Sequence, residues 1–169
     1  MDRPGISGKQ ALRPSPGELR ALQIVQVALM GGVLLFGLVV VLIAMRPPAA
    51  GAAPIAQRVL VLLSAVHAVI ALIVWSLAPL LQGLLVARLG AQLGTAGGVG
   101  ALRGALIVRL ALLEGPALFG LVICLIAATG GALRATPLYW LNALSAVAFV
   151  GYGVLSFPTA ERLEALADR

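Results

Sequence analysis

The chain has 169 residues, of which 61% are hydrophobic and only 11% are charged, and its mean hydropathy is +1.07. Soluble globular domains carry roughly a quarter charged residues, so this composition excludes the soluble class. The net charge of +6 does not indicate a nucleic-acid surface. The basic residues are spread along the ends of apolar runs, without a basic stripe or interleaved aromatic residues. The excess of Lys and Arg instead matches the bias of cytoplasmic loops in membrane proteins.

Four apolar stretches are long enough to cross a bilayer, which takes about 20 mainly apolar residues. The first stops before Pro47 and the fourth before Pro158, because proline removes a backbone donor and clashes with the preceding turn. The second contains Pro79. The sequence therefore predicts an all-α integral membrane bundle of four transmembrane helices. The predicted spans are residues 21–45, 59–86, 106–128 and 138–157.

The stretch between the second and third spans permits two interpretations. If Pro79 ends the embedded part of the second helix, residues 80–94 form a cytoplasmic extension. Residues 101–113 carry Arg103 and Arg109 on an apolar background. They fit an interfacial helix before the third span, because arginine reaches headgroups from about one turn inside the membrane. Whether residues 80–113 are embedded or interfacial stays open.

The distribution of Lys and Arg predicts the orientation. With the N-terminus inside, nine basic residues face the cytoplasm and three face outward, which favours N-in and C-in. We expect a bacterial inner-membrane protein with a flexible cytoplasmic segment at residues 1–20, a membrane domain at 21–157 and a short cytoplasmic helix or tail at 158–169. The first ~20 residues are too polar for a signal peptide. The outward-facing basic residues are Arg46, Arg58 and Arg134.

Glu114 is the only acidic residue between Glu18 and Glu161, and it lies in the apolar stretch 109–130. A carboxylate costs several kcal/mol in hydrocarbon unless it is paired, protonated or facing water. Glu114 is therefore the leading candidate functional residue.

Residues 111–127, ALLEGPALFGLVICLIA, resemble the carboxylate-bearing helix of the rotary-ATPase c subunit (proteolipid), which reads roughly A-L-x-E-A-x-A-x-Y/F-G-L-V-I-A. That resemblance implies that Glu114 takes up and releases a proton or sodium ion. The chain departs from the family in three ways: residues 59–75 lack its alternating glycines, residues 90–104 lack its polar loop, and the carboxylate lies on the third span. The matching residues are Ala111, Leu112, Glu114, Ala117, Phe119, Gly120, Leu121, Val122 and Ile123.

The chain as a whole resembles an uncharacterised family of small bacterial four-span membrane proteins. The likeness rests on the first span (LQIVQVALMGGVLLF, residues 22–36), on R-x-A-L-L-E-G-P-A-L-F-G (residues 109–120) and on a closing F-P-T (residues 157–159). It implies no activity.

A structural role for Glu114 is the alternative. Proline is favoured in the first turn of a helix, and an acidic residue just before Pro116 could cap free backbone N–H groups. An interfacial helix would then end at Leu113. The possible charge partners are Arg88, Arg103 and Arg109. Arg109 lies five positions before Glu114, about 140° round the helix, so a partner has to come from another helix or subunit.

His67 is the only histidine and lies within the second span. Because histidine titrates near neutrality, it is a candidate proton relay to Glu114. If the span ends at Pro79, the two residues lie ~18 Å and ~15 Å from the cytoplasmic edge, so their depths are compatible. If the helix stays embedded to Val86, their depths differ by roughly 10 Å. The alternative is an interhelical hydrogen bond, to Asn142 or Ser64, worth around 1 kcal/mol.

Small and polar residues indicate where helices pack. Gln23, Gln26, Gln82 and Asn142 are expected to bond between helices. Gly90 with Gly94 and Gly100 with Gly104 form GxxxG pairs, and Gly31, Gly32, Gly37, Gly151 and Gly153 mark the first and fourth spans. These glycines allow close helix contact, within the bundle or between copies.

No chemistry-bearing motif accompanies these features. Metal binding needs clustered His, Cys, Asp or Glu, and the sequence shows neither such a cluster nor a nucleophile motif. We therefore expect no enzymatic activity, no metal and no cofactor. The sequence predicts a structural or accessory subunit that self-associates or packs with other membrane proteins in the bilayer. The alternative is a proton- or ion-translocating protein with Glu114 as the titrating carboxylate.

Overall fold

The computed structural model describes residues 16–47, 57–89, 98–159 and 161, except the side chains of residues 86, 87, 89 and 98–103. Within these ranges the chain is helical and contains no strand. Four segments are long and apolar enough to cross a membrane, so the predicted four-helix membrane bundle is confirmed. The helices are α1 (Pro16–Met45), α2 (Gln57–Leu89), α3 (Gly98–Thr129), α4 (Ala132–Ala135), the 3₁₀ helix η2 (Pro137–Ala143) and α5 (Leu144–Leu155).

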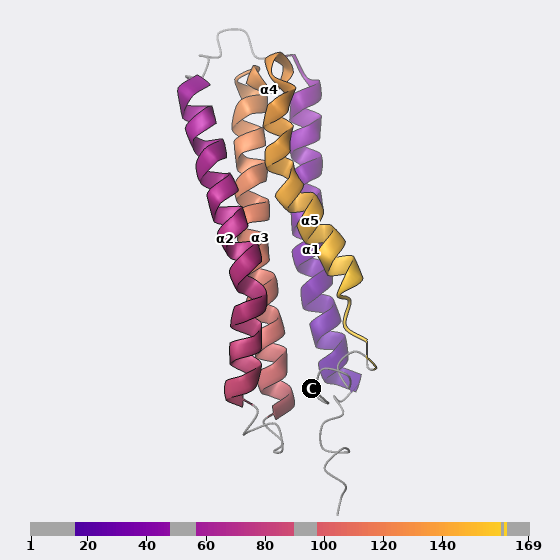
Figure 1. The fold of residues 1–169 in the computed structure, drawn as a ribbon. Helices are drawn as coiled ribbons and strands as arrows, with labels where there is room; N and C mark the ends of the chain where they lie inside the picture. The colour runs from indigo at the N-terminus through magenta and orange to yellow at the C-terminus, as the bar shows by residue number, and fades with distance from the viewer. Residues whose placement is uncertain (1–15, 48–56, 90–97, 160, 162–169) are drawn as a thin grey trace, which may run out of the picture.

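The helices run up, down, up and down, and α3 is the central one (Figure 1). It packs against α1, α2 and α5, and half of its most apolar stretch is buried, against 11% in α1 and in α2. We call the end of the bundle where α1 begins and α5 ends the lower end, as Figure 1 shows it. The core joins α1, α2, α3 and α5 and contains fully buried Val33, Val40, Cys124 and Phe149, with Ala78 from α2. Large apolar side chains elsewhere on α1 and α2 are exposed, as lipid contact requires.

Two prolines lie inside helices, and neither ends its helix. Helix α2 continues through Pro79 to Leu89, and α3 continues through Pro116 from Gly98 to Thr129. The prediction of an interfacial helix that ends at Leu113 is therefore wrong. Proline is tolerated within transmembrane helices because neighbouring helices and polar side chains satisfy the backbone groups that it frees. Helix α1 also begins five residues before the predicted span, at Pro16.

The turn between the third and fourth spans has structure that the sequence pattern did not predict. Gly131 adopts a left-handed conformation (φ 75°), which ends the helical run and starts the short α4. Arg134 of α4 donates hydrogen bonds to the carbonyl oxygens of Ala44 (3.1 Å) and Met45 (2.6 Å). The last turn of α1 is thereby capped by a cation, which suits the negative end of a helix.

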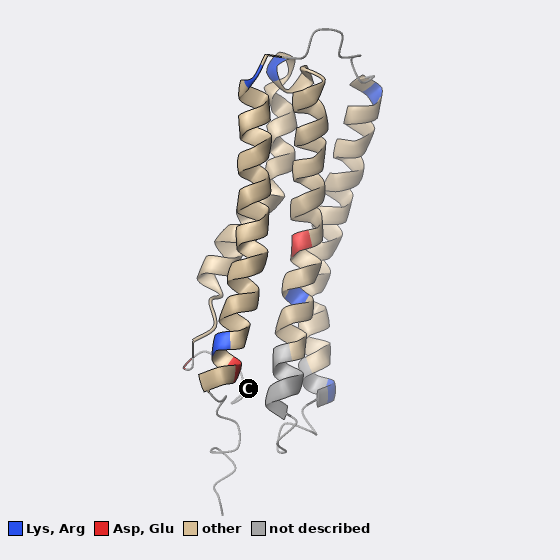
Figure 2. Ribbon diagram, turned by 180° about the vertical axis from the view of Figure 1, so that it is seen from behind, with Lys and Arg blue, Asp and Glu red and all other residues tan. Residues whose placement is uncertain are grey.

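Most of the described basic residues lie at the two ends of the bundle, in blue in Figure 2, whereas Arg109 lies within α3, between the lower end and Glu114. Arg20 and Arg88 mark the lower end, and Arg46, Arg58 and Arg134 mark the upper end. This grouping matches the two sides assigned from the sequence. The first fifteen residues, the tail after residue 161 and the predicted packing pair Gly90 and Gly94 lie outside the described residues.

Candidate functional site

A buried polar cluster joins α2, α3 and the fourth span around His67. The His67 side chain is only 4% exposed. Its Nδ1 lies 3.0 Å from Asn142 Oδ1, and its Nε2 lies 3.0 Å from both the Pro116 carbonyl oxygen and Ser145 Oγ. The interhelical hydrogen bond to Asn142 predicted from the sequence is confirmed. Ser64 enters through Asn142, whose Nδ2 donates to Ser64 Oγ at 3.0 Å.

Local structure places each member of this cluster. Asn142 lies in η2 and Ser145 in the first turn of α5, three positions apart, so both side chains point to the same side of the fourth span. Gly120 leaves room for them. A Cβ at that position would lie 2.0 Å from the Asn142 carbonyl oxygen and 2.9 Å from the His67 ring. The Phe119 ring meets the imidazole edge to face, with the ring centres 5.7 Å apart.

The hydrogen-bond pattern restricts the state of the imidazole. Asn142 Nδ2 also donates to the Tyr139 carbonyl oxygen at 3.0 Å, so the amide oxygen must face His67 Nδ1, which therefore carries a hydrogen. At Nε2, a neutral ring accepts from the Ser145 hydroxyl, whereas a protonated ring donates to the Pro116 carbonyl. The cluster therefore offers partners to His67 in both protonation states.

Glu114 lies about halfway along α3, where Figure 2 shows a single red segment in that helix. It is ten residues, or ~15 Å along the helix axis, beyond Gly104, where the described side chains of α3 begin. Its side chain is partly exposed. No hydrogen bond or ion pair joins Glu114 to another residue in the part of the chain that the structure describes. Because α3 runs through this position without a break, the prediction that Glu114 caps a helix is wrong.

The three arginines proposed as charge partners of Glu114 have different outcomes. Arg109 is bound elsewhere: its Nη1 donates to Gln82 Oε1, and its guanidinium lies 4.7 Å from the centre of the Tyr152 ring. Arg88 is exposed near the end of α2. The side chain of Arg103 lies outside the description. An ion pair of Glu114 with Arg109 is therefore contradicted by the structure.

His67 and Glu114 are not brought together. The imidazole contacts α3 on the side that faces α2 and the fourth span, through the Pro116 carbonyl and Gly120. The Glu114 side chain projects about 160° away from Pro116 around the helix, toward the seam between α3 and α1. Among the described residues no hydrogen bond connects the two, so a direct relay between them is not formed.

The glycines near Glu114 face open space. Among the described residues, nothing lies within 4 Å of a Cβ built at Gly104 or Gly115, which lie on the same side of α3, about three turns apart. The same holds for Gly31 and Gly32 of α1. These glycines therefore do not pack helices within the bundle. Of the predicted packing glycine Gly100, the structure gives only its place in the first turn of α3.

Contacts between α1 and α3 fix the height of Gly32 relative to Glu114. Leu22 packs with Leu106 and Ile107, and Gly37 faces Leu121 at 3.9 Å. The two helices run in parallel with a register offset of about 84 residues, so Gly32 lies within about half a turn of the level of Glu114. We call the outward surface of Gly32, Gly104 and Gly115, with Glu114 at its edge, the glycine face.

Polar contacts hold the fourth span against α1. Gln26 donates to the Gly153 carbonyl oxygen at 2.6 Å, and Gln23 donates to the Pro158 carbonyl oxygen at 3.0 Å. With the contact of Gln82 to Arg109, these bonds confirm that three glutamines act between helices. Gly153 packs directly on Met30.

A groove of about 710 Å³ lies between α2 and the fourth span, on the side of His67 away from Glu114. Its walls are mostly alanine and leucine, and the His67 cluster forms the polar part of its lining. Among the described residues, no three His, Cys, Asp or Glu side chains lie close enough to hold a metal ion.

Sequence reasoning missed several members of these sites. The carbonyl of Pro116, Ser145, Gly120 and the Tyr152 ring all take part in contacts that single-residue patterns do not reveal. One signal was present: Asn142 and Ser145 are polar residues three apart in an otherwise apolar span. Such spacing places two polar side chains on one helix face.

Fold and polar sites together define a small multi-pass, all-helical membrane protein with a buried histidine cluster and an unpaired carboxyl group at mid-depth. Comparisons with protein-family models, curated proteins and solved structures give no match for this chain.

Proposed function

We propose that the protein is a non-enzymatic accessory subunit of the bacterial inner membrane that packs against a second copy of itself, or against another membrane protein, through the glycine face. One observation supports this function most directly: Glu114 is partly exposed at mid-depth on the outside of the bundle and has no partner among the described residues. A carboxyl group placed there in lipid costs several kcal/mol. A hydrogen-bond donor from a docked helix offsets that cost.

The surface around Glu114 suits a docked helix. Gly104 and Gly115 leave the backbone of α3 uncovered, and Gly32 does the same on α1. Small residues let helix backbones approach closely, which is the main source of helix association in membranes. The combination of an uncovered backbone and an unsatisfied carboxyl group favours a protein partner over lipid at this surface.

The proposed orientation places the lower end of the bundle in the cytoplasm. The lower end carries Arg20 and Arg88, and the remaining basic residues assigned to this side lie in segments that adjoin it. A majority of Lys and Arg on one side favours that side as cytoplasmic.

Ion translocation is a second candidate function, and the same residue favours it. An unpaired carboxyl group at mid-depth can bind a proton or a cation from either side of the membrane. Because His67 is held by Asn142, Ser145 and the Pro116 carbonyl, this candidate rests on Glu114 alone.

Cross-linking in lipid vesicles tests self-association through the glycine face. Gly115→Cys in a Cys124→Ala background puts the only thiol on that face, because Cys124 is the only native cysteine. We expect a disulfide dimer on mild oxidation, and we expect Glu114→Leu to reduce its yield. Leu72→Cys, on the exposed side of α2, is the matched control and should give little dimer. Equal cross-linking at both positions would contradict the proposed face.

Proton and sodium flux into vesicles separates the two candidate functions. Glu114→Gln keeps the size of the side chain and a hydrogen-bonding group but cannot titrate. An accessory subunit gives no flux above empty vesicles, with or without this change. A flux that Glu114→Gln abolishes would instead assign ion translocation to Glu114.

A further inference from the structure

Arg109 is a cation within the membrane with only neutral partners. It lies in α3 five residues before Glu114, about 7–8 Å nearer the lower end of the bundle. Arginine stays protonated in proteins, so this charge cannot be removed by deprotonation. Its contacts are the Gln82 amide oxygen and the face of the Tyr152 ring. No carboxylate contacts it in the described part of the chain.

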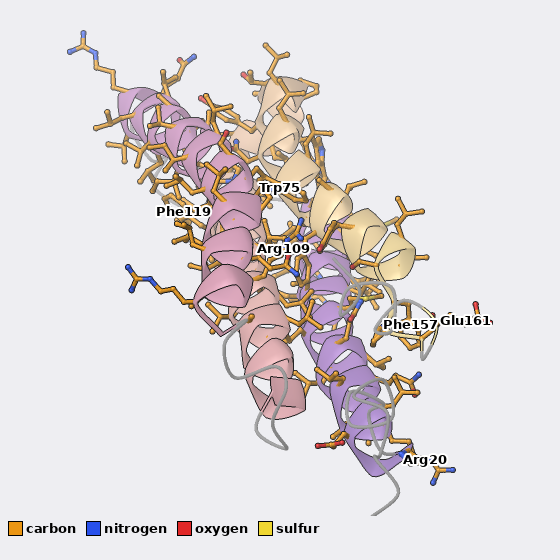
Figure 3. The ribbon with its side chains drawn as sticks, turned by 60° about the horizontal axis from the view of Figure 1, so that its bottom comes forward. Arg20, Trp75, Arg109, Phe119, Phe157 and Glu161 are labelled. Carbon is orange, nitrogen blue, oxygen red and sulfur yellow. The ribbon has the colours of Figure 1, made fainter. Side chains whose placement is uncertain are left out.

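Three helices fix the position of the guanidinium. Gln82 comes from α2, Arg109 from α3 and Tyr152 from α5, and Trp75 of α2 supports the Tyr152 ring edge to face at 6.1 Å between ring centres. Figure 3 shows Arg109 among the four helices, with Trp75 further up the bundle. Holding an arginine in one position costs side-chain entropy. The packing therefore fixes the guanidinium and does not leave it to extend freely toward water.

Part of the guanidinium is left without a partner. The Arg109 Nε is buried and makes no hydrogen bond, and the only hydrogen bond from this side chain is the one from Nη1. Nη2 is therefore also free of protein partners in the described residues. A buried donor without a partner is unfavourable, and more so when it is charged. The adjacent Nε and Nη2 form the donor fork that binds two oxygens of one anion.

We propose that Arg109 binds the phosphate of an anionic phospholipid from the leaflet at the lower end of the bundle. Tyr152, which the guanidinium contacts, lies three residues (~4.5 Å) before the end of α5, so Arg109 is within reach of the phosphate layer for a headgroup that enters between helices. The forked guanidinium matches phosphate oxygens better than a lysine would. The position of the Tyr152 ring near the end of α5 also fits the boundary between headgroups and acyl chains.

Trp75 supplies a reporter for the experiment. The chain has two tryptophans, so Trp140→Phe leaves Trp75 as the only one. The purified full chain in phosphatidylcholine nanodiscs is compared with nanodiscs of increasing phosphatidylglycerol content. We expect saturable changes in Trp75 emission and a rise in Tm with phosphatidylglycerol, and no such change with added inorganic phosphate.

Variants at Arg109 test whether this residue carries the response to phosphatidylglycerol. Arg109→Gln should weaken the phosphatidylglycerol response at least about tenfold, the loss of one charge-assisted pair. Arg109→Lys should retain part of it, because charge remains without the fork. Arg88→Gln, which removes an exposed charge at the same end, should leave the response unchanged.

Two results would overturn the proposal. An equal response of the parent protein to phosphatidylcholine and phosphatidylglycerol would reject the proposal. This comparison needs no variant, so poor folding of Arg109→Gln would not affect it. A full response in well-folded Arg109→Gln would reject it as well. A response to inorganic phosphate that Arg109→Gln removes would keep the phosphate site but assign it to a free anion rather than a lipid.

Discussion

At the scale of single residues, the cost of adding a methyl group at a glycine depends on what it would meet. At Gly120 the nearest atom is the backbone oxygen of Asn142, at 2.0 Å from a built Cβ. At Gly153 the nearest atom is Met30 Sδ, at 2.4 Å, in a side chain with three rotatable bonds. A backbone cannot move aside as a thioether can, so two similar clashes have different consequences.

Gly120→Ala should therefore lower the free energy of unfolding by about 3 kcal/mol, since the fourth span must shift away from α3. Gly153→Ala should cost less than about 1 kcal/mol, because Met30 can change rotamer. Denaturant titration of both variants in the same micelles measures the difference. Equal losses would mean that the fourth span lies further from α3 at Gly120 than the structure has it.

The His67 cluster gives a second residue-scale prediction. Asn142→Ala removes the bonds to Ser64 and the Tyr139 carbonyl and leaves His67 Nδ1 without its acceptor. We expect a loss of about 1–3 kcal/mol, which is the cost of an unpaired buried donor. Leu141→Ala, one position away but 59% exposed, should change the free energy of unfolding by less than about 0.5 kcal/mol. Equal losses of stability in the two variants would contradict a stabilising role for the His67 cluster.

At the scale of helices, α3 combines one buried side with one open side. Leu113, Ala117, Leu121 and Cys124 lie on the buried side, whereas Gly104 and Gly115 lie on the open one. Such a helix is central to its own bundle and still available to a neighbour. In the part of the chain that the structure describes, the open glycines make no contact that would offset their lower helix propensity.

Gly104→Ala should therefore raise the stability of the isolated chain by up to about 1 kcal/mol, because alanine favours a helix and meets no neighbour there. Thermal unfolding of monomeric protein in micelles checks this value. A loss of stability would show that Gly104 packs against part of the same chain.

The number and approximate limits of the helices could be predicted from apolar length alone, because lipid leaves the backbone few other choices. The continuity of α3 could not. Proline and glutamate at positions 114–116 look like a helix start, and only the packing of α3 between α1, α2 and α5 permits the helix to continue. The 3₁₀ start of the fourth span was missed for a related reason: residues 137–143 carry no signal that separates 3₁₀ from α.

The contacts at the candidate sites could also be predicted only in part. The contact of His67 with Asn142 could be predicted because a buried polar side chain in a membrane needs a polar partner, and few exist. The partners of Arg109 could not, since Gln82 and Tyr152 come from two other helices and no spacing within one segment brings them together.

At the scale of the whole molecule, the described arginines other than Arg109 lie at the two ends of the bundle, and the proposed orientation places the lower end in the cytoplasm. Thiol reagents that cannot cross membranes should label the variant Ala52→Cys in intact spheroplasts. They should label Gly5→Cys and Ala167→Cys only after lysis. Cys124→Ala serves as the background. Labelling at position 5 but not at 167 in intact spheroplasts would imply an odd number of crossings.

The position of Glu114 is the central claim, and carbodiimide labelling tests it most directly. A lipid-soluble carbodiimide reacts with carboxyl groups that face hydrocarbon, and a membrane-impermeant one reacts only with groups that face water. In vesicles we predict modification of Glu114 by the lipid-soluble reagent alone, detected by mass spectrometry and absent in Glu114→Gln. Modification by the impermeant reagent alone, or by neither, would contradict a carboxyl group at mid-depth on the outer surface of the bundle.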